Sequence, residues 1–365
     1  MNKLAILALA DGTIYEGCSF GADTEACGEV VFNTSMTSYQ EVLTDPSYAG
    51  QIVVPTYPVI GNCGINEVNA ESDRAQIRGL AVREVVGAPS HYQSSQTIEQ
   101  YLTNAGIPGI TGLDTRAITR KLRSQGTMMG ILTSQKTPEQ ALEFLRTAPA
   151  YKDINLVREF SARSVAHQQV GNASGKYRVA VLDCGCPRSI LRMLSSLDCA
   201  TTIMPHTASA KEILDLTPDG LFVSPGPGNA ELLDDIVRNL QGLVGHFPII
   251  GVGLGSQLIT RALGGKNIKL KYGHHGNNHP VRDLRTGRVY ITSQNHGYIP
   301  DSDSLPSELE ISHCNLNDGT IEGLRHKTLP IMTLQYYSES SSRSIDGKYI
   351  FEEFLEMIRQ EKGHP

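Results

Sequence analysis

Apolar and polar positions alternate differently in the two halves of the chain. To about residue 150, short β-prone runs separated by turn residues predict three strands, over 30–32, 51–54 and 79–83. Helical spacing of apolar residues then predicts two helices, over 95–104 and 114–125. Asp11-Gly12 lies between two further β-prone runs, which is typical of a hairpin and argues against a signal segment over 4–10. The first half is therefore predicted to be a mixed α/β domain.

From residue 176 the pattern becomes a regular exchange of strands and helices. Short apolar runs predict strands over 177–183, 220–224 and 248–252. Helical spacing follows each of them, through 190–194, 230–240 and 256–263. This alternation predicts a doubly wound, largely parallel sheet, which binds ligands at the carboxyl ends of its strands. The polar stretch 151–175 is interpreted as a linker, which gives domains over 1–150 and 176–365.

Composition narrows the class of protein. The chain has 365 residues, of which 40% are hydrophobic and 19% charged, so two domains with sizeable cores are expected. A net charge of -6 disfavours a nucleic-acid binder, and no apolar run approaches the ~20 residues of a membrane span. Seven cysteines form no repeated framework, which indicates a reduced, cytoplasmic protein.

Two glycine-rich loops are the candidate chemical sites. One covers 224–228 and the other 251–255, and each follows a predicted strand. Glycine lets the backbone approach a ligand and frees N–H groups for an anion or oxyanion. The second loop departs from the dinucleotide-binding pattern, and the chain lacks a P-loop, so a nucleotide site is disfavoured.

Long ordered motifs identify a family. The first half contains GEVVFNTSMT at 28–37, YQE at 39–41, LTDPSY at 43–48, TYP at 56–58 and DTR at 114–116. The second contains SPGPG at 224–228, KYGHHG at 271–276, NHP at 278–280 and SQNHG at 293–297. Residues 1 to about 358 resemble the small subunit of carbamoyl-phosphate synthetase, and the second half resembles a class I glutamine amidotransferase domain.

The resemblance implies a cysteine glutaminase that works with a large subunit. In that family a Cys on the strand-to-helix elbow, a His base and a Glu hydrolyse glutamine through a thioester, and ammonia passes to the partner. The large subunit, with ATP and Mg, makes carbamoyl phosphate from bicarbonate for arginine and pyrimidine synthesis. No cofactor and no metal are expected on this chain itself, and glutamine is its candidate ligand.

The chain departs from the family in the triad. Gly253 stands at the nucleophile position and Tyr337 at the base position, which leaves only Glu339. A tyrosine hydroxyl has an ordinary pKa of about 10, so it is a poor replacement for a histidine base. We therefore predict that the glutaminase step is lost. The glutamine-contact positions that match the family or carry a similar residue are Ser47, Gly226, Gly228, Leu254, Gln257, Asn295, Gly297 and Tyr298.

Other residues offer weaker alternatives. Ser256 could replace the nucleophile but is expected inside a helix, and Cys184 and Cys186 are interpreted as structural thiols. The histidines at 274, 275 and 279 are expected to be structural rather than metal ligands. Three hypotheses remain: a small subunit that supplies no ammonia, a stand-alone glutamine-binding sensor or scaffold, and an active glutaminase with a non-standard nucleophile.

Overall fold

A computed structural model describes residues 3–162, 164–165, 175–337 and 347–363, and the chain divides into two compact units. The first comprises Met1–Ile154 with Lys271–Gly276, and the second comprises Asn155–Leu270 with Asn277–Pro365. Much of the predicted linker (163 and 166–174) lies outside the described residues. The predicted domain limits at 150 and 176 stay a prediction.

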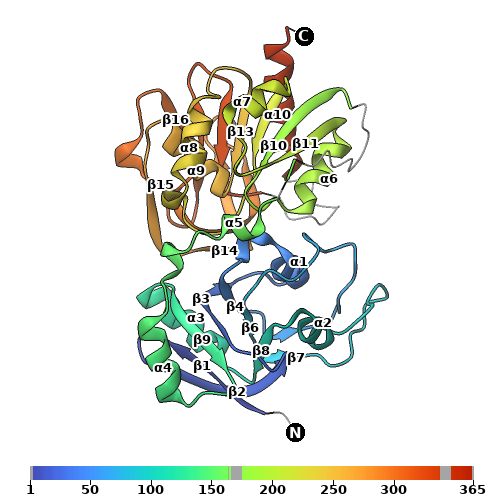
Figure 1. The fold of residues 1–365 in the computed structure, drawn as a ribbon, viewed down its shortest axis with the longest axis vertical. Coiled ribbons are helices and arrows are strands. Elements are labelled where there is room, and N and C mark those ends of the chain that lie inside the picture. The colour runs from blue at the N-terminus through green and yellow to red at the C-terminus, as the bar shows by residue number, and fades with distance from the viewer. Residues whose placement is uncertain (1–2, 163, 166–174, 338–346, 364–365) are drawn as a thin grey trace. The chain divides into compact units, whose positions relative to one another are not determined.

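The first unit is built on a closed seven-stranded barrel, in the order β1-β2-β8-β6-β4-β3-β9 (Figure 1). Its strands are β1 (Leu4–Leu9), β2 (Ile14–Gly21), β3 (Ala26–Asn33), β4 (Gln51–Pro55), β6 (Gly79–Ala81), β8 (Pro108–Thr111) and β9 (Met128–Thr133). A separate pair is β5 (Val59–Ile60) and β7 (Glu84–Val85). The predicted hairpin at Asp11-Gly12 is confirmed, because β1 and β2 pair antiparallel with Ala8 opposite Ile14. The barrel closure itself was not predicted.

Helices flank this barrel. They are α1 (Tyr39–Thr44), α2 (Ile98–Ala105), α3 (Thr115–Gln125) and α4 (Pro138–Thr147). The helices predicted over 95–104 and 114–125 are confirmed as α2 and α3, and their first residues are set by caps. The Thr97 side chain accepts from the backbone N–H of Gln100, and the Asp114 side chain from that of Ala117.

The second unit contains a nine-stranded sheet in the order β11-β10-β12-β13-β18-β17-β16-β14-β15. Its strands are β10 (Tyr177–Asp183), β11 (Cys199–Pro205), β12 (Gly220–Val223), β13 (Ile249–Val252), β14 (Asn267–Asp283), β15 (Val289–Pro300), β16 (Leu309–Asn315), β17 (Ile321–His326) and β18 (Ile331–Leu334). The strands from β11 to β18 in that order pair in parallel, as predicted. β17 and β16 extend the sheet antiparallel.

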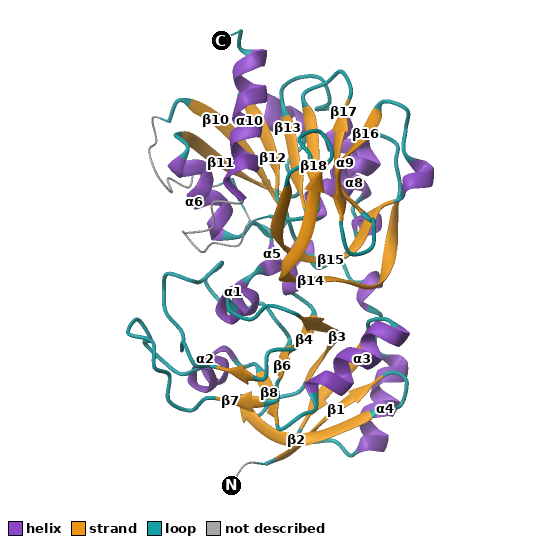
Figure 2. Cartoon of the chain, turned by 180° about the vertical axis from the view of Figure 1, so that it is seen from behind, coloured by secondary structure: helices purple, strands orange, loops and turns teal. Residues whose placement is uncertain are grey.

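Helices cover both faces of this sheet, which confirms the doubly wound prediction. They are α5 (Val157–Phe160), α6 (Arg188–Ser196), α7 (Ala210–Asp215), α8 (Asp234–Gln241), α9 (Leu254–Ala262) and α10 (Lys348–Glu361). One hydrophobic cluster joins α7, α8 and α9 to one face, and a second joins α6 and α10 to the other. In Figure 1 the face of the sheet that carries α8 and α9 is toward the viewer. Figure 2 shows the molecule from behind, with the face that carries α10 toward the viewer. No helix in the described ranges is both long and apolar enough to cross a bilayer.

A buried histidine on β16 is expected to make the stability of the second unit depend on pH. His313 is 1% exposed, and Ser312 Oγ lies 2.9 Å from its Nδ1. Burial lowers the pKa of His313 to about 4, with Arg325 and Arg285 acting in the same direction and Asp283 opposing them. The folded chain therefore keeps this imidazole neutral where the unfolded chain would protonate it.

We expect the free energy of unfolding to fall by about 2 kcal/mol between pH ~6.5 and pH ~5 on account of His313. In that window the unfolded chain takes up a proton that the folded chain does not, so stability rises with pH. Denaturant titrations of wild type and His313→Gln at several pH values would measure this slope, which the variant should lose. A histidine resonance of His313 that titrates near its ordinary value would contradict the assignment.

Candidate active site

The junction of β13 and α9 is a sharp strand-to-helix elbow centred on Gly253. Gly253 has φ +55° and ψ -117°, and it stands at the N-cap of α9. Its N–H donates to Leu334 O at 2.8 Å, and its carbonyl accepts from the N–H groups of Ser256 (3.0 Å) and Gln257 (3.3 Å). Backbone hydrogen bonds thus hold the turn, in a conformation that glycine adopts at least cost.

A side chain at this position would point at the neighbouring loop. A Cβ added to Gly253 would lie 3.1 Å from Pro225 Cβ, with the Pro225 Cα the next nearest atom at 3.5 Å. The elbow therefore faces the loop that follows β12, which is the other predicted glycine-rich loop. The two loops that the sequence singled out are adjacent at the carboxyl edge of the sheet.

Two glycines of the β12 loop have backbone reasons of their own. A Cβ on Gly226 would lie 2.2 Å from Cys184 O, and Gly228 has φ +96°. Each position therefore requires glycine whether or not a ligand binds there. Their match to the family's glutamine contacts is consequently not independent evidence of binding.

A buried polar network lies beneath the elbow. Gln257 Nε2 donates to Tyr298 O (3.3 Å) and to Gln335 Oε1 (3.4 Å), while Gln335 Nε2 donates to Ser256 Oγ (3.3 Å). Ser256 is fully buried, and Gln257 is 3% exposed. Gln257 Oε1 accepts no hydrogen bond from the described residues, which leaves one buried acceptor for a ligand or water.

Tyr337 is buried beside the sheet, just beyond β18. It is 4% exposed, and its N–H donates to Ser293 O at 3.3 Å across an isolated bridge to β15. The preceding Tyr336 is 1% exposed, and its hydroxyl pairs with that of Tyr349 from α10. Burial raises the pKa of Tyr336 well above its ordinary value. The third triad position, Glu339, lies outside the described residues.

The other predicted glutamine contacts come from several elements. Leu254 and Gln257 are in the first turns of α9, and three come from β15: Asn295, Gly297 and Tyr298. The hydrogen bond from Gln257 to Tyr298 O brings α9 and β15 together. Ser47 belongs to the first unit, where Asp45 Oδ1 accepts from its N–H at 2.8 Å.

The candidate replacement nucleophiles are poorly placed for chemistry. Ser256 is buried in α9 beneath the elbow. Cys184 has no exposed surface, and burial raises the pKa of its thiol. Cys186 is half-buried, with its Sγ 3.7 Å from Pro187 O. All seven cysteines lie in the described part of the chain, and none forms a disulfide.

Two of the histidines that were predicted to be structural, His274 and His275, are buried. His275 packs edge-on against Phe32 with ring centroids 6.5 Å apart, and its carbonyl accepts from Thr34 N at 3.0 Å. The contacts of His275 are those of a packed core residue in the first unit.

Sequence reasoning missed a buried carboxylate in the second unit. Glu322 on β17 is 0% exposed, accepts from Asn315 Nδ2 at 2.8 Å and lies 3.7 Å from His296 Nε2. His296 Nδ1 is 3.1 Å from Tyr298 O, the carbonyl that also accepts from Gln257. The sequence motif around His296 pointed to β15. No sequence pattern around Glu322 on β17 signals that its carboxylate is buried.

The second unit is similar in sequence to the class I glutamine amidotransferases. The family model "Glutamine amidotransferase class-I" matches residues 180–357, and "Carbamoyl-phosphate synthase small chain, CPSase domain" matches residues 7–132. The carbamoyl phosphate synthase small chain of Akkermansia muciniphila is 44% identical over 98% of each chain. That of Symbiobacterium thermophilum is 45% identical over 96% of this chain and 97% of the relative. This chain therefore belongs to the carbamoyl phosphate synthase small chain family.

Proposed function

We propose that this chain is a carbamoyl phosphate synthase small subunit that has lost its own glutaminase step. It would associate with a large subunit that uses ATP and Mg to make carbamoyl phosphate from bicarbonate, with nitrogen taken from free ammonia. The carbamoyl phosphate would be used in arginine and pyrimidine synthesis. The chain itself would carry no cofactor.

The observation that carries this proposal is Gly253 at the elbow between β13 and α9. A cysteine there would present its thiol at a helix N-terminus, which favours the thiolate. Glycine presents no group at all. Neither the buried Ser256 nor the buried Cys184 supports a substitute. Tyr337 at the base position adds a second departure from the same reaction.

The proposed association with a large subunit rests on other parts of the chain. Family membership extends over both units, including residues 7–132, which belong to the domain particular to the synthase small chain. The barrel and the doubly wound sheet both have extensive buried cores. Association with a large subunit is therefore inferred from family membership over both units.

The deciding experiment compares nitrogen donors. A large subunit from the same genome is combined with this chain, and carbamoyl phosphate formation is measured with glutamine or with ammonium chloride. We expect product with ammonium and none with glutamine. Glutamate release by the isolated chain, with Ser256→Ala as the comparison, tests the non-standard nucleophile in parallel. Robust glutamine-dependent synthesis would contradict the loss of glutaminase.

A glutamine-binding scaffold is the second candidate, and the orphaned Gln257 Oε1 is the observation that favours it. Calorimetry with glutamine and co-purification with the large subunit separate the two functions. Stable association supports the synthase subunit, whereas glutamine binding without association supports the scaffold.

A further inference from the structure

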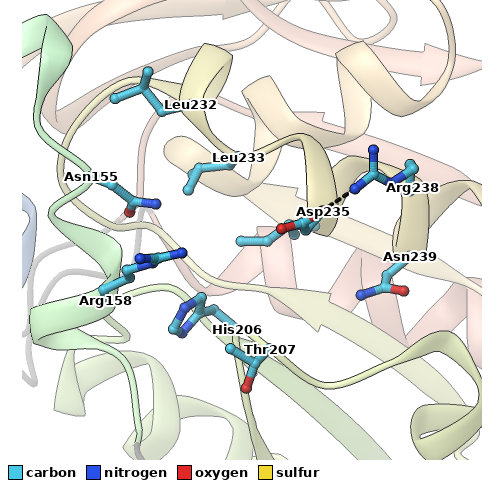
Figure 3. A pocket seen from close by; sticks show the side chains of 10 residues that line it. Asn155, Arg158, His206, Thr207, Leu232, Leu233, Asp235, Arg238 and Asn239 are labelled. Carbon is cyan, nitrogen blue, oxygen red and sulfur yellow. Dashed lines mark hydrogen bonds and ion pairs between the residues drawn. The ribbon is translucent and has the colours of Figure 1, made fainter.

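A polar pocket of about 460 Å³ opens in the second unit where α5 meets α8 and the loop after β11 (Figure 3). Its polar side chains are Asn155, Arg158, His206, Thr207, Asp235, Arg238 and Asn239, and its apolar wall is formed by Leu232, Leu233 and Ile236. Its volume lies in the usual range of small-molecule sites.

Some of the polar groups in this pocket are already paired. Arg238 forms an ion pair with Asp235, one turn earlier on α8. Asn239 Nδ2 donates to Ala208 O at 3.1 Å. These contacts hold one side of the pocket and cancel one of its two guanidinium charges.

Three groups on the opposite side lack such partners. Arg158 is exposed, and it forms no ion pair with any described residue, so its guanidinium is open to a ligand. His206 Nδ1 and Asn155 Oδ1 are buried and make no hydrogen bond with the described part of the chain. Figure 3 shows the side chains of Arg158 and His206 turned toward each other at one end of the pocket. Buried polar atoms without partners are uncommon and call for a ligand or water.

We propose that this pocket binds a small organic anion whose carboxylate or phosphate pairs with Arg158 and whose hydroxyl or N–H groups donate to Asn155 Oδ1 and His206 Nδ1. Leu232, Leu233 and Ile236 contact its carbon skeleton. A guanidinium is well suited to either anion because it donates two parallel hydrogen bonds. The orphaned acceptors make a ligand with donors a better fit than a bare ion.

The ionisation of His206 is consistent with its role as an acceptor. Burial and the charge of Arg158 lower the pKa of His206, while Asp183 opposes them. The ring is therefore neutral near pH 7, and one of its nitrogens can accept a hydrogen bond from a ligand hydroxyl. Its backbone N–H donates to Ser161 Oγ at 3.0 Å, which fixes the loop that carries it.

This site is separate from the elbow. It lies at the carboxyl end of β11, whereas the elbow ends β13, and β10 and β12 lie between those strands in the sheet. Among the described residues, none of the predicted triad or glutamine-contact positions lines the pocket. The proposal therefore does not depend on the fate of the glutaminase reaction.

The test is calorimetric titration of the full chain with L-malate, glycerol 3-phosphate and inorganic phosphate. We expect saturable binding of at least one organic anion, with a tighter Kd than inorganic phosphate, because only the organic anions carry donors for the orphaned acceptors. Preference for malate or for glycerol 3-phosphate tells a carboxylate site from a phosphate site. Arg158→Gln and Asn155→Asp should each weaken binding at least about tenfold, equivalent to ~1.4 kcal/mol.

Arg288→Gln is the matched control, since it removes one exposed guanidinium of the same unit from outside the pocket. It should leave Kd unchanged, and unfolding curves of all variants should match that of wild type. The histidine resonance of His206 should shift on ligand addition. Absence of saturation below about 10 mM for both organic anions, or unchanged binding by Arg158→Gln, would overturn the proposal.

Discussion

The double variant Gly253→Cys, Tyr337→His is expected to release glutamate from glutamine, whereas the wild-type chain is not. The cysteine restores a nucleophile at the N-terminus of α9, and the histidine restores a base at the family position. Gly253→Cys alone should be slower than the double variant by about 10²–10⁴-fold, the usual contribution of a positioned base. Glutamate release, and trapping of the thioester by mass spectrometry, measure the effect.

Gly253→Ala combined with Tyr337→His is the matched control for this experiment. Alanine adds the same Cβ, 3.1 Å from Pro225 Cβ and at φ +55°, but carries no thiol. It should share the modest loss of stability, about 1–2 kcal/mol, that a side chain in this backbone conformation costs. It should remain inactive. A folded double variant without activity would mean that the surrounding pocket has also diverged, and an active wild type would contradict the proposed loss.

The second large effect is structural: Gly255→Ala is expected to destabilise the second unit by at least about 3 kcal/mol. Gly255 is in the first turn of α9, and its N–H donates to Ser224 O at 3.1 Å. An added Cβ would lie 2.1 Å from Val223 O and 2.7 Å from Val223 C, both backbone atoms. Because backbone of a central strand cannot move aside, the helix would have to shift away from the sheet. Chemical denaturation gives the free energy of unfolding.

Gly297→Ala provides the comparison for that measurement. Gly297 is in the same unit on β15, and apart from its chain neighbours no atom of the described residues lies within 4 Å of the Cβ it would receive. The free energy of unfolding of Gly297→Ala should stay within about 0.5 kcal/mol of the wild-type value. Equal stabilities of the two alanine variants would show that α9 can move off β12, which would contradict the close approach of Gly255 to Val223.

Much of the fold followed from local patterns. The strand runs at 177–183 and 248–252 and the hairpin at Asp11-Gly12 were predictable because each depends on neighbours in sequence. The barrel of the first unit and the antiparallel extension of the sheet were not, since both depend on pairing between distant strands. β14 illustrates the limit: its segment Lys271–Gly276 groups with the first unit, although the rest of the strand belongs to the second.

The candidate site was predictable where it follows a motif. Gly253 and the β12 loop were found from glycines at strand ends, and the structure brings them within contact distance. Glu322 was missed because a single carboxylate in a β-prone run has no distinguishing pattern, and only burial reveals it. The pocket around Arg158 was missed for a similar reason, because its residues come from separate segments of the chain with no shared spacing.

The hydrogen bonds around Gly253 have an evolutionary consequence. The turn is held by the carbonyls of Leu334 and Ser224 and by the Gly253 carbonyl itself, none of which depends on the side chain at 253. Its shape can therefore persist when the nucleophile is removed by a single codon change. A lineage with ample environmental ammonia could discard glutamine hydrolysis in one mutational step and still inherit the complete subunit. Recovery of the nucleophile would also take a single codon change, since the turn that presents it would already be formed.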